Sequence, residues 1–329
     1  MKSIVAISLL FAAGCAEMTD PNDPNGDGGD DGKSDVWGVD SRKERYQYAS
    51  NSQLQVAIRA SAATFITSEI EFDVASNTWK SKILKTLHDS ERLCDGERFE
   101  TQPAVSYCSA TLIAPDIMLT AGHCHADTPC EELITIFDYA YEAKPTDPTA
   151  IAQAFTPDKV YRYKEKIAAN FNVDYDNESG QDYALYRLDR PVTDRPFAQV
   201  NWDQPVAEKQ ATYVVGHPSR LPQKIARGAV ISDANADFVE HSTDVFGGNS
   251  GGGMFDKDGR LIGVHVHSSA KRYVPDDTEQ SCNVVAVCGD NAECKRKPHA
   301  YKPSALKKLL SPQLRTELGV PADPEPAPQ

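Results

Sequence analysis

Short runs rich in apolar and β-branched residues recur along most of the chain, and Gly, Pro, Asp or Asn bounds each of them. Examples are "ATLIAPDIMLTA", "ALYRLDRPV", "ATYVVGHP" and "LIGVHVHSS". Such spacing is typical of an all-β barrel or sandwich. A helical pattern appears only near the C-terminus, in "PSALKKLLSPQLRTELG". We therefore expect an all-β domain over residues 37–302, one amphipathic helix over 303–319 with a break at Pro312, and a Pro-rich tail over 320–329.

The first residues, "MKSIVAISLLFAAGC", run from a lysine through a short apolar stretch to small residues and Cys15. This is the pattern of a secretion signal over residues 1–15, and it is too short to cross a bilayer as a stable helix. The small residues before Cys15 resemble a bacterial lipobox, although Ala12 stands where leucine is usual. Lipidation of Cys15 would tether the mature chain to the outer membrane. The alternative is plain secretion or release into the periplasm, and either route predicts an exported protein.

Residues 16–36 are acidic and rich in Gly and Pro, with almost nothing to bury. Such a composition predicts a solvated linker with a reach of roughly 25 Å. Asp23, Asn25 and Asp27 match the opening of a calcium loop, but Ser34 stands where such a loop closes with glutamate. The linker is therefore the favoured interpretation.

The formal net charge of -14 argues against nucleic acid as a partner, because phosphate binding needs clustered Lys and Arg. A length of 329 residues and a hydrophobic fraction of 40% are those of a globular protein with a sizeable core.

Eight cysteines in an exported chain favour disulfides. No two of them form a Cys-x-x-Cys pair, so zinc is a poor interpretation of the set. His265 and His267 lie on one face of a strand-like run, but no third ligand is evident. We therefore expect no metal site.

Five glycines surround one serine in "DVFGGNSGGGMF", from Asp244 to Phe255. Glycine costs conformational entropy, so a dense run indicates a tight turn or a close approach of the backbone. One use is to aim peptide N–H groups at a single oxygen that gains negative charge during acyl transfer. Ser250 would then be a nucleophile. A flexible loop with an incidental serine is the alternative, so the interpretation depends on partners elsewhere in the chain.

A nucleophilic serine needs a base, and the base needs a group that fixes its tautomer. "LTAGHC" supplies His123 at the end of an apolar run, and "GQDYALYRLDRPV" supplies Asp182 at the head of another. Either context alone is weak, because a histidine after a strand is more often structural and an aspartate at a strand start usually belongs to a turn. The order His, Asp, Ser is the more specific signal.

With these three residues, the chain resembles a chymotrypsin-fold serine peptidase of the bacterial trypsin-like branch, near the glutamyl endopeptidase-like enzymes. The segments that carry the resemblance spread from about Ser41 to His299 and read "CSATLIAPDIMLTAGHC", "DYALYRLDRPV", "YVVGHPSRLPQK", "GGNSGG" and "LIGVHVHSS". The resemblance implies an all-β, chymotrypsin-like fold of two antiparallel six-stranded barrels with a C-terminal helix. It also implies that His123 and Asp182 come from the first barrel and Ser250 from the second.

The resemblance assigns a role to each of these residues. His123 would take the proton from Ser250 and return it to the leaving amine, while Asp182 orients His123. The N–H groups of Gly248 and Ser250 would form the oxyanion hole, which explains the crowded glycines. The substrates would be proteins or peptides, and no cofactor is needed.

The resemblance also bears on the cysteines. Cys108 and Cys124 match the family's disulfide beside the catalytic histidine. We also expect Cys94 to pair with Cys130, which would pin the segment that enters the barrel. Three further cysteines follow: Cys282, Cys288 and Cys294. These three can supply only one pair among themselves, and that pairing stays open.

Two residues give conflicting signals about specificity. Asp244 lies six residues before Ser250, where a trypsin-like pocket has the carboxylate that binds Arg or Lys. His265 matches the histidine that helps glutamyl endopeptidases bind glutamate, but Val245 replaces the threonine that partners that histidine. An aspartate beside a bound glutamate would also repel it. A structural hydrogen-bonding role for Asp244 and a core position for His265 are equally open.

Activation is a further point of difference from animal trypsins. Asn249 stands where those enzymes carry the aspartate that pairs with a freshly cut N-terminus, so that mode of activation should be absent. The segment "WGVDSRKERYQ" near Trp37 leaves a cleavage nearby open.

Two other functions are open besides an endopeptidase. A protease fold can serve as a non-catalytic binding module, because fold alone does not give function. Degenerate copies normally lose His, Asp or Ser, and none is lost here. An esterase would share all the chemistry and differ only in its substrate cleft.

Overall fold

The computed structural model describes residues 39–126, 128–174, 179–232, 237–267, 273–276, 278, 281–286 and 298–323. The predicted signal with Cys15 and the predicted linker lie outside these residues, as do Cys288, Cys294 and the last residues of the tail. None of the helices in the described ranges is long and apolar enough to cross a membrane.

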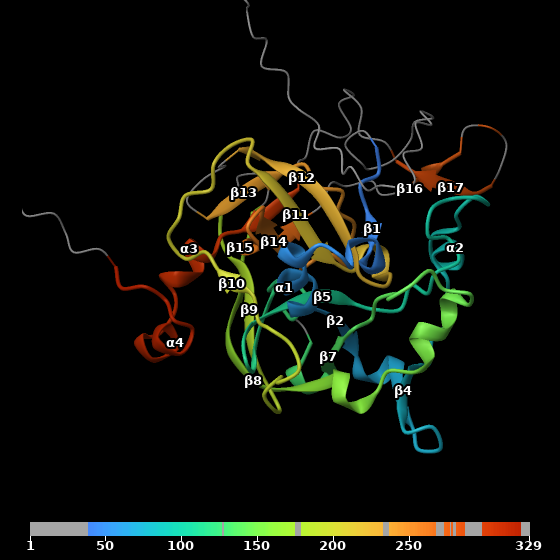
Figure 1. Cartoon of the computed structure of the whole chain (residues 1–329), viewed down its shortest axis with the longest axis horizontal. Coiled ribbons are helices and arrows are strands. Elements are labelled where there is room, and N and C mark those ends of the chain that lie inside the picture. Colours follow the sequence, from blue (N-terminus) through green and yellow to red (C-terminus); the bar gives the residue numbers. More distant parts are fainter. Residues whose placement is uncertain are drawn as a thin grey trace, which may run out of the picture. The chain divides into compact units, whose positions relative to one another are not determined.

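Six antiparallel strands close into a first barrel (Figure 1). In the order of their pairing they are β2 (Ser61–Ile66), β5 (Cys108–Ala114), β6 (Ile117–Thr120), β9 (Asp182–Leu188), β8 (Val160–Phe171) and β7 (Leu133–Phe137). β7 pairs with β2 and completes the ring. These strands are built from the short apolar runs of the sequence, and β5 and β6 are buried along their whole length.

A second ring of six antiparallel strands follows in the chain (Figure 1). In pairing order they are β12 (Lys224–Ser232), β11 (Ala211–Gly216), β14 (Gly253–Asp256), β15 (Arg260–His267), β18 (His299–Tyr301) and β13 (Phe238–His241). β13 returns to β12 and closes the ring. Val214, Val239 and Met254 belong to one cluster of its apolar core. The two rings confirm the predicted all-β fold of two antiparallel six-stranded barrels.

Short elements surround the barrels. β1 (Lys43–Glu44) runs antiparallel to β12, and β10 (Gln199–Val200) runs parallel to β15. Two hairpins pair β3 (Ile70–Asp73) with β4 (Thr78–Ser81), and β16 (Tyr273–Pro275) with β17 (Asn283–Val285). The described α-helices are α1 (Ser52–Ala60), α2 (Leu87–Glu91), α3 (Pro303–Lys307) and α4 (Pro312–Glu317). Short 3₁₀ helices span Arg45–Tyr48, Thr67–Glu69, Cys130–Glu132, Pro148–Gln153, Pro157–Lys159 and Pro218–Arg220.

The C-terminal helix expected over 303–319 is divided into α3 and α4. Pro312 is the first residue of α4, a position where its missing N–H is not needed by the helix. The Ser311 side chain caps this start by accepting a hydrogen bond from Leu314 N at 3.3 Å. The break therefore lies at the proline, because a proline ring cannot continue a helix from the preceding turn.

One predicted disulfide is confirmed and the other is wrong. Cys108 and Cys124 are bonded to each other. Cys94 is bonded to Cys282 and not to Cys130, which has a free thiol.

Backbone pairing between distant segments explains the bond between Cys94 and Cys282. The Cys94 N–H donates to Asn283 O at 2.9 Å, and the Asn283 N–H donates to Arg92 O at 2.8 Å. These bonds align two segments whose cysteines are 188 residues apart in the sequence. Spacing along the chain carries no sign of this pairing.

Candidate active site

His123 and Asp182 lie at the ends of two neighbouring strands of the first barrel. His123 follows β6 after a short turn, and Asp182 begins β9, which pairs with β6. Asp182 Oδ2 is 2.8 Å from His123 Nδ1, and Asp182 Oδ1 accepts a hydrogen bond from His123 N at 3.0 Å. A carboxylate at Nδ1 favours the tautomer with its proton there and leaves Nε2 as the base. The Asp182 side chain is fully buried while 27% of the His123 side chain is exposed, so the ring is fixed but accessible.

Gly122 permits the turn that carries His123. A Cβ at position 122 would lie 2.0 Å from Asn170 O and 2.9 Å from Tyr183 N. Any side chain would therefore push this turn away from β8 and β9. The glycine in "LTAGHC" is required by the close packing of the turn.

Ser250 lies in a tight turn between β13 and β14 of the second barrel. The Asn249 N–H donates to Phe246 O at 3.0 Å, and the Gly252 N–H donates to Asn249 O at 2.7 Å. The Gly251 N–H donates to His265 O at 2.8 Å and ties the turn to β15. We call residues Asp244–Gly252 the nucleophile turn.

Two glycines of the nucleophile turn have backbone conformations that favour glycine. The φ angle is 96° at Gly248 and 85° at Gly251. A Cβ on Gly248 would lie 2.4 Å from His217 O, and one on Gly251 would lie 2.1 Å from Ser109 O. The crowded glycines are therefore a steric requirement of the turn.

Ser250 is one of the residues through which the nucleophile turn contacts the first barrel. Its carbonyl accepts a hydrogen bond from Ser109 N at 2.8 Å, and Cys124 Sγ lies 3.7 Å from the same oxygen. Because Cys124 directly follows His123, the structure brings the serine and the histidine into the same region. In the described part of the chain their side chains are not hydrogen-bonded to each other. Contacts between a nucleophile and its base often tighten only when substrate binds.

The two amides predicted for the oxyanion hole differ from the amide between them. Among the described residues, neither the Gly248 N–H nor the Ser250 N–H donates to another backbone group, whereas the Asn249 N–H does. The turn can therefore offer two donors to an oxygen of a substrate.

Ser109 is a residue of this site that sequence reasoning missed. It is fully buried in β5, and its hydroxyl donates to Gly248 O at 2.7 Å. The Ser109 hydroxyl oxygen in turn accepts a hydrogen bond from His217 N at 2.9 Å. The Gly248 carbonyl lies between the two predicted oxyanion amides along the chain, so Ser109 positions this part of the turn from the other barrel. Its only signal in the sequence is its place next to Cys108.

Residues 108–264 match the family model of the trypsin-like peptidase domain. The two barrels therefore have a chymotrypsin-like fold, and the matched segment is similar to a trypsin-like peptidase domain. The match begins at β5 and ends within β15, so it includes His123, Asp182 and Ser250.

Two solved structures resemble this chain at low sequence identity. A serine endoprotease from Yersinia pestis is 13% identical, with a TM-score of 0.44, 82% of this chain covered and 66% of that chain covered. A Glu endopeptidase solved in complex with MPD is 17% identical, with a TM-score of 0.45, 82% of this chain covered and 94% of that chain covered. A comparison with curated proteins found no match.

Asp244 is buried and has partners within the protein. The backbone N–H of Ser41 donates to Asp244 Oδ2 at 2.7 Å, and the Ser41 hydroxyl donates to the same oxygen. Only 2% of Asp244 is exposed. Of the two interpretations open for Asp244, these contacts correspond to the structural hydrogen-bonding one.

His265 is fully buried in β15. Its Nδ1 is 3.2 Å from Nε2 of His241, and Nδ1 of His241 is 2.6 Å from Oγ1 of Thr243. Burial lowers the pKa of His265 well below its usual value and lowers the pKa of His241 to about 3. Both rings are therefore neutral at pH 7. With Thr243 they form a buried hydrogen-bonded row that links β15 to the end of β13.

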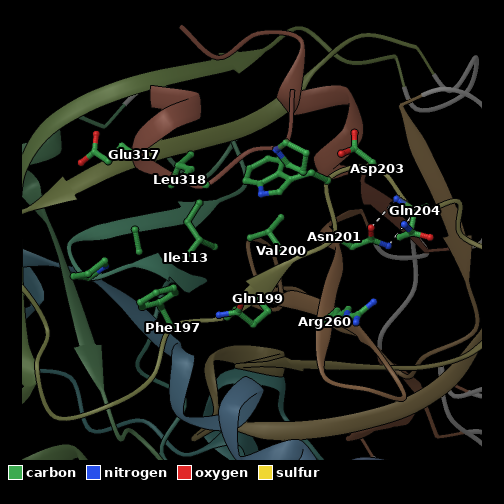
Figure 2. Close-up of a pocket in the computed structure, with 16 residues that line it drawn as sticks. Ile113, Phe197, Gln199, Val200, Asn201, Asp203, Gln204, Arg260, Glu317 and Leu318 are labelled. Carbon is green, nitrogen blue, oxygen red and sulfur yellow. Dashed lines mark hydrogen bonds between the residues drawn. The ribbon is translucent and has the colours of Figure 1, made fainter. Parts of the chain in front are cut away.

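A pocket of about 530 Å³ is lined by a different set of residues (Figure 2). Its lining comes partly from the segment that joins the barrels, with Phe197 and Val200, and partly from the end of α4, with Glu317 and Leu318. None of the three predicted catalytic residues lines it. The pocket is therefore separate from the candidate active site.

Two groups of metal-type ligands lie outside the candidate active site within the described ranges. In the first, Cys94 and Cys282 are bonded to each other beside Asp276, so their sulfurs are not free thiolates. The second group lies at α2. His88, Asp95 and Glu100 have ligand atoms within 4.8 Å of one another. Asp95 is exposed, and exposed acidic groups commonly gather without a metal. This cluster is not a reason to assign a metal to the protein.

Proposed function

We propose that this protein is an exported serine endopeptidase that acts through His123, Asp182 and Ser250. The proposal depends mainly on one observation. The buried carboxylate of Asp182 binds both the ring and the backbone of His123, beside a glycine-rich turn that carries Ser250. The similarity to a trypsin-like peptidase domain supports this chemistry.

The mechanism follows from these positions. Ser250 Oγ attacks the carbonyl carbon of the scissile peptide bond while His123 Nε2 removes its proton. The carbonyl oxygen becomes negative, and the N–H groups of Gly248 and Ser250 donate to it. His123 then protonates the leaving amine, the C–N bond breaks, and an ester on Ser250 remains.

Water completes the reaction in a second step. His123 removes a proton from the water, whose oxygen attacks the ester carbonyl and forms the carboxylic acid product. The proton returns to Ser250 as the ester bond breaks. Asp182 stabilises the imidazolium that forms in each step.

Covalent labelling tests the nucleophile. A fluorophosphonate should label the wild-type chain on Ser250, and labelling should disappear in Ser250→Ala and in His123→Ala. Ser81→Ala is a matched control, because Ser81 is a buried serine in the β3–β4 hairpin, outside the candidate site. Labelling that survives in Ser250→Ala would contradict the proposal.

Cleavage of a diverse peptide library, read by mass spectrometry, tests the substrate class. Cuts that disappear in Ser250→Ala would establish a peptidase. A preference for Arg or Lys before the cut would favour Asp244 as the residue that sets specificity, and a preference for Glu would favour His265. Turnover of simple esters alone would favour an esterase. Neither labelling nor turnover would favour a binding module on a protease fold.

Export is proposed from the signal pattern, and the two disulfides support it because disulfides persist in oxidising compartments. Lipidation of Cys15 predicts that the mature chain begins at this residue and partitions with membranes. Intact mass of the mature protein, compared with a Cys15→Ser variant, tests this prediction. A mature chain without lipid would establish plain secretion instead.

A further inference from the structure

We propose that Asp40–Arg42 form a built-in clamp on the nucleophile turn, with Asp244 as the anchor of this clamp rather than a ligand for the substrate side chain. We call these three residues the N-terminal clamp. The inference rests on the proposed peptidase function, because it concerns how the turn that carries Ser250 is held in place.

Ser41 makes the first contact between the clamp and the nucleophile turn. Its backbone N–H and its hydroxyl both donate to Asp244 Oδ2. The Ser41 hydroxyl also accepts a hydrogen bond from Arg227 N at 3.1 Å, which ties the residue to β12. The Asp244 carboxylate is also almost fully buried, so a substrate cation could reach it only by displacing the chain that covers it.

Arg42 makes the second contact. Its guanidinium carbon lies 3.9 Å from the centroid of the Phe246 ring, and the side chain is fully buried. Asp40 neutralises it through two hydrogen bonds, at 2.9 Å to Nε and 2.8 Å to Nη2. A buried cation over an aromatic ring is favourable when a carboxylate balances its charge. Phe246 is also the residue whose carbonyl accepts from Asn249 N, so Arg42 contacts the residue on which the turn closes.

Other segments hold the clamp and the turn together from outside. Arg98 donates from Nη1 to Asp40 O and from Nη2 to Arg42 O, each at 2.7 Å. The ring of Tyr273 in β16 packs against Phe246, with 5.7 Å between the ring centroids. The clamp is thus an integrated part of the domain and not a loose end of the chain.

The clamp needs no free α-amino group. The nitrogen of Ser41 that binds Asp244 belongs to a peptide bond, and Val39 and Asp40 precede it in the described chain. The contacts that order the turn are therefore made in the uncut chain. We infer that cleavage upstream of the clamp is not required for an ordered active site.

Two substitutions of Asp244 separate an anchor from a substrate ligand. Asp244→Asn removes the charge but keeps an oxygen that can accept from Ser41, so kcat/KM should stay within about threefold of wild type with an unchanged preference for the residue before the cut. Asp244→Ala removes the acceptor and should lower kcat/KM by about tenfold or more for every peptide. A selective loss of cleavage after Arg and Lys in Asp244→Asn would overturn the proposal.

Hydrogen exchange of the amides in residues 244–251 tests the clamp without any need for activity. Ser41→Ala and Arg42→Lys should each speed this exchange by about tenfold, because each weakens one contact while the rest of the domain is kept. Ser81→Ala is the matched control, since it removes a buried hydroxyl that donates to Ile83 O at 2.7 Å, and it should leave these amides unchanged. Exchange at the wild-type rate in both clamp variants would overturn the proposal. An inactive wild-type chain would instead refute the proposed function, and the exchange result would still stand.

Discussion

The two halves of the candidate active site are held in place in different ways. His123 and Asp182 come from neighbouring strands of one barrel, and two hydrogen bonds between them set their geometry. The nucleophile turn instead depends on residues that are distant in sequence, such as Ser109 in the first barrel and Ser41 before β1. One half of the site is therefore fixed within a single barrel, and the other half is fixed by contacts from outside its own barrel.

The largest effect is expected from a substitution in the His123–Asp182 pair. In Asp182→Asn the carboxamide cannot accept hydrogen bonds at both positions, and its NH₂ group would favour the wrong tautomer of His123. We expect kcat for peptide cleavage to fall by about 10⁴-fold, the size typical of losing the orienting carboxylate. Asp116→Asn is a matched control, because Asp116 forms an ion pair with Arg187 and has no contact with His123. A variant that kept a tenth of the activity would show that the pair does not have this role.

A smaller effect is expected from Ser109→Ala, which removes a contact that supports the nucleophile turn. The substitution leaves Gly248 O without its buried donor, at a cost of about 1 to 3 kcal/mol, so kcat should fall by about 10-fold to 100-fold. KM should change little, because Ser109 is buried and acts on the turn rather than on substrate. Ser106→Ala controls for the loss of a buried hydroxyl, since the Ser106 hydroxyl has no hydrogen-bond partner in the described structure. Equal activity in the two variants would argue against a positioning role for Ser109.

The smallest effect concerns stability and the first barrel alone. His125 is buried next to Tyr186, and burial lowers its pKa to about 3. At pH values between about 3 and the ordinary pKa of about 6.5, the unfolded chain binds a proton at His125 and the folded chain does not. The free energy of unfolding therefore falls as the pH falls through this range.

The variant His125→Phe should remove this part of the pH dependence. Between pH 7 and pH 5.5 its free energy of unfolding, measured in urea, should fall by about 1 kcal/mol less than that of the wild type. His88→Gln, at a half-buried histidine of α2, should not show this reduced loss. The same loss in His125→Phe and wild type would show that folding does not lower the pKa of this ring.

Much of the fold could be predicted because its signals are local. Alternation of apolar runs with Gly, Pro, Asp and Asn predicted an all-β barrel or sandwich, and the family resemblance implied the two six-stranded barrels. Proline chemistry predicted the break at Pro312. The candidate residues His123 and Ser250 could be named because each lies in a short motif whose glycines are required by tight turns. Gly122 and Gly248 show this requirement directly, since a Cβ at either position would meet a backbone oxygen.

The sequence by itself determined the strand-rich fold, the breaks between its elements and the turns that carry the candidate catalytic residues, because each depends on residues close together in the chain. Only the tertiary structure decided that Cys94 pairs with Cys282, that Ser109 supports Gly248, and that Ser41 binds Asp244. These contacts join residues 188, 139 and 203 positions apart. A serine or an aspartate has the same local signature whether its partner is a substrate or a distant segment, so the partner becomes known only when the two barrels and the N-terminal segment are packed together.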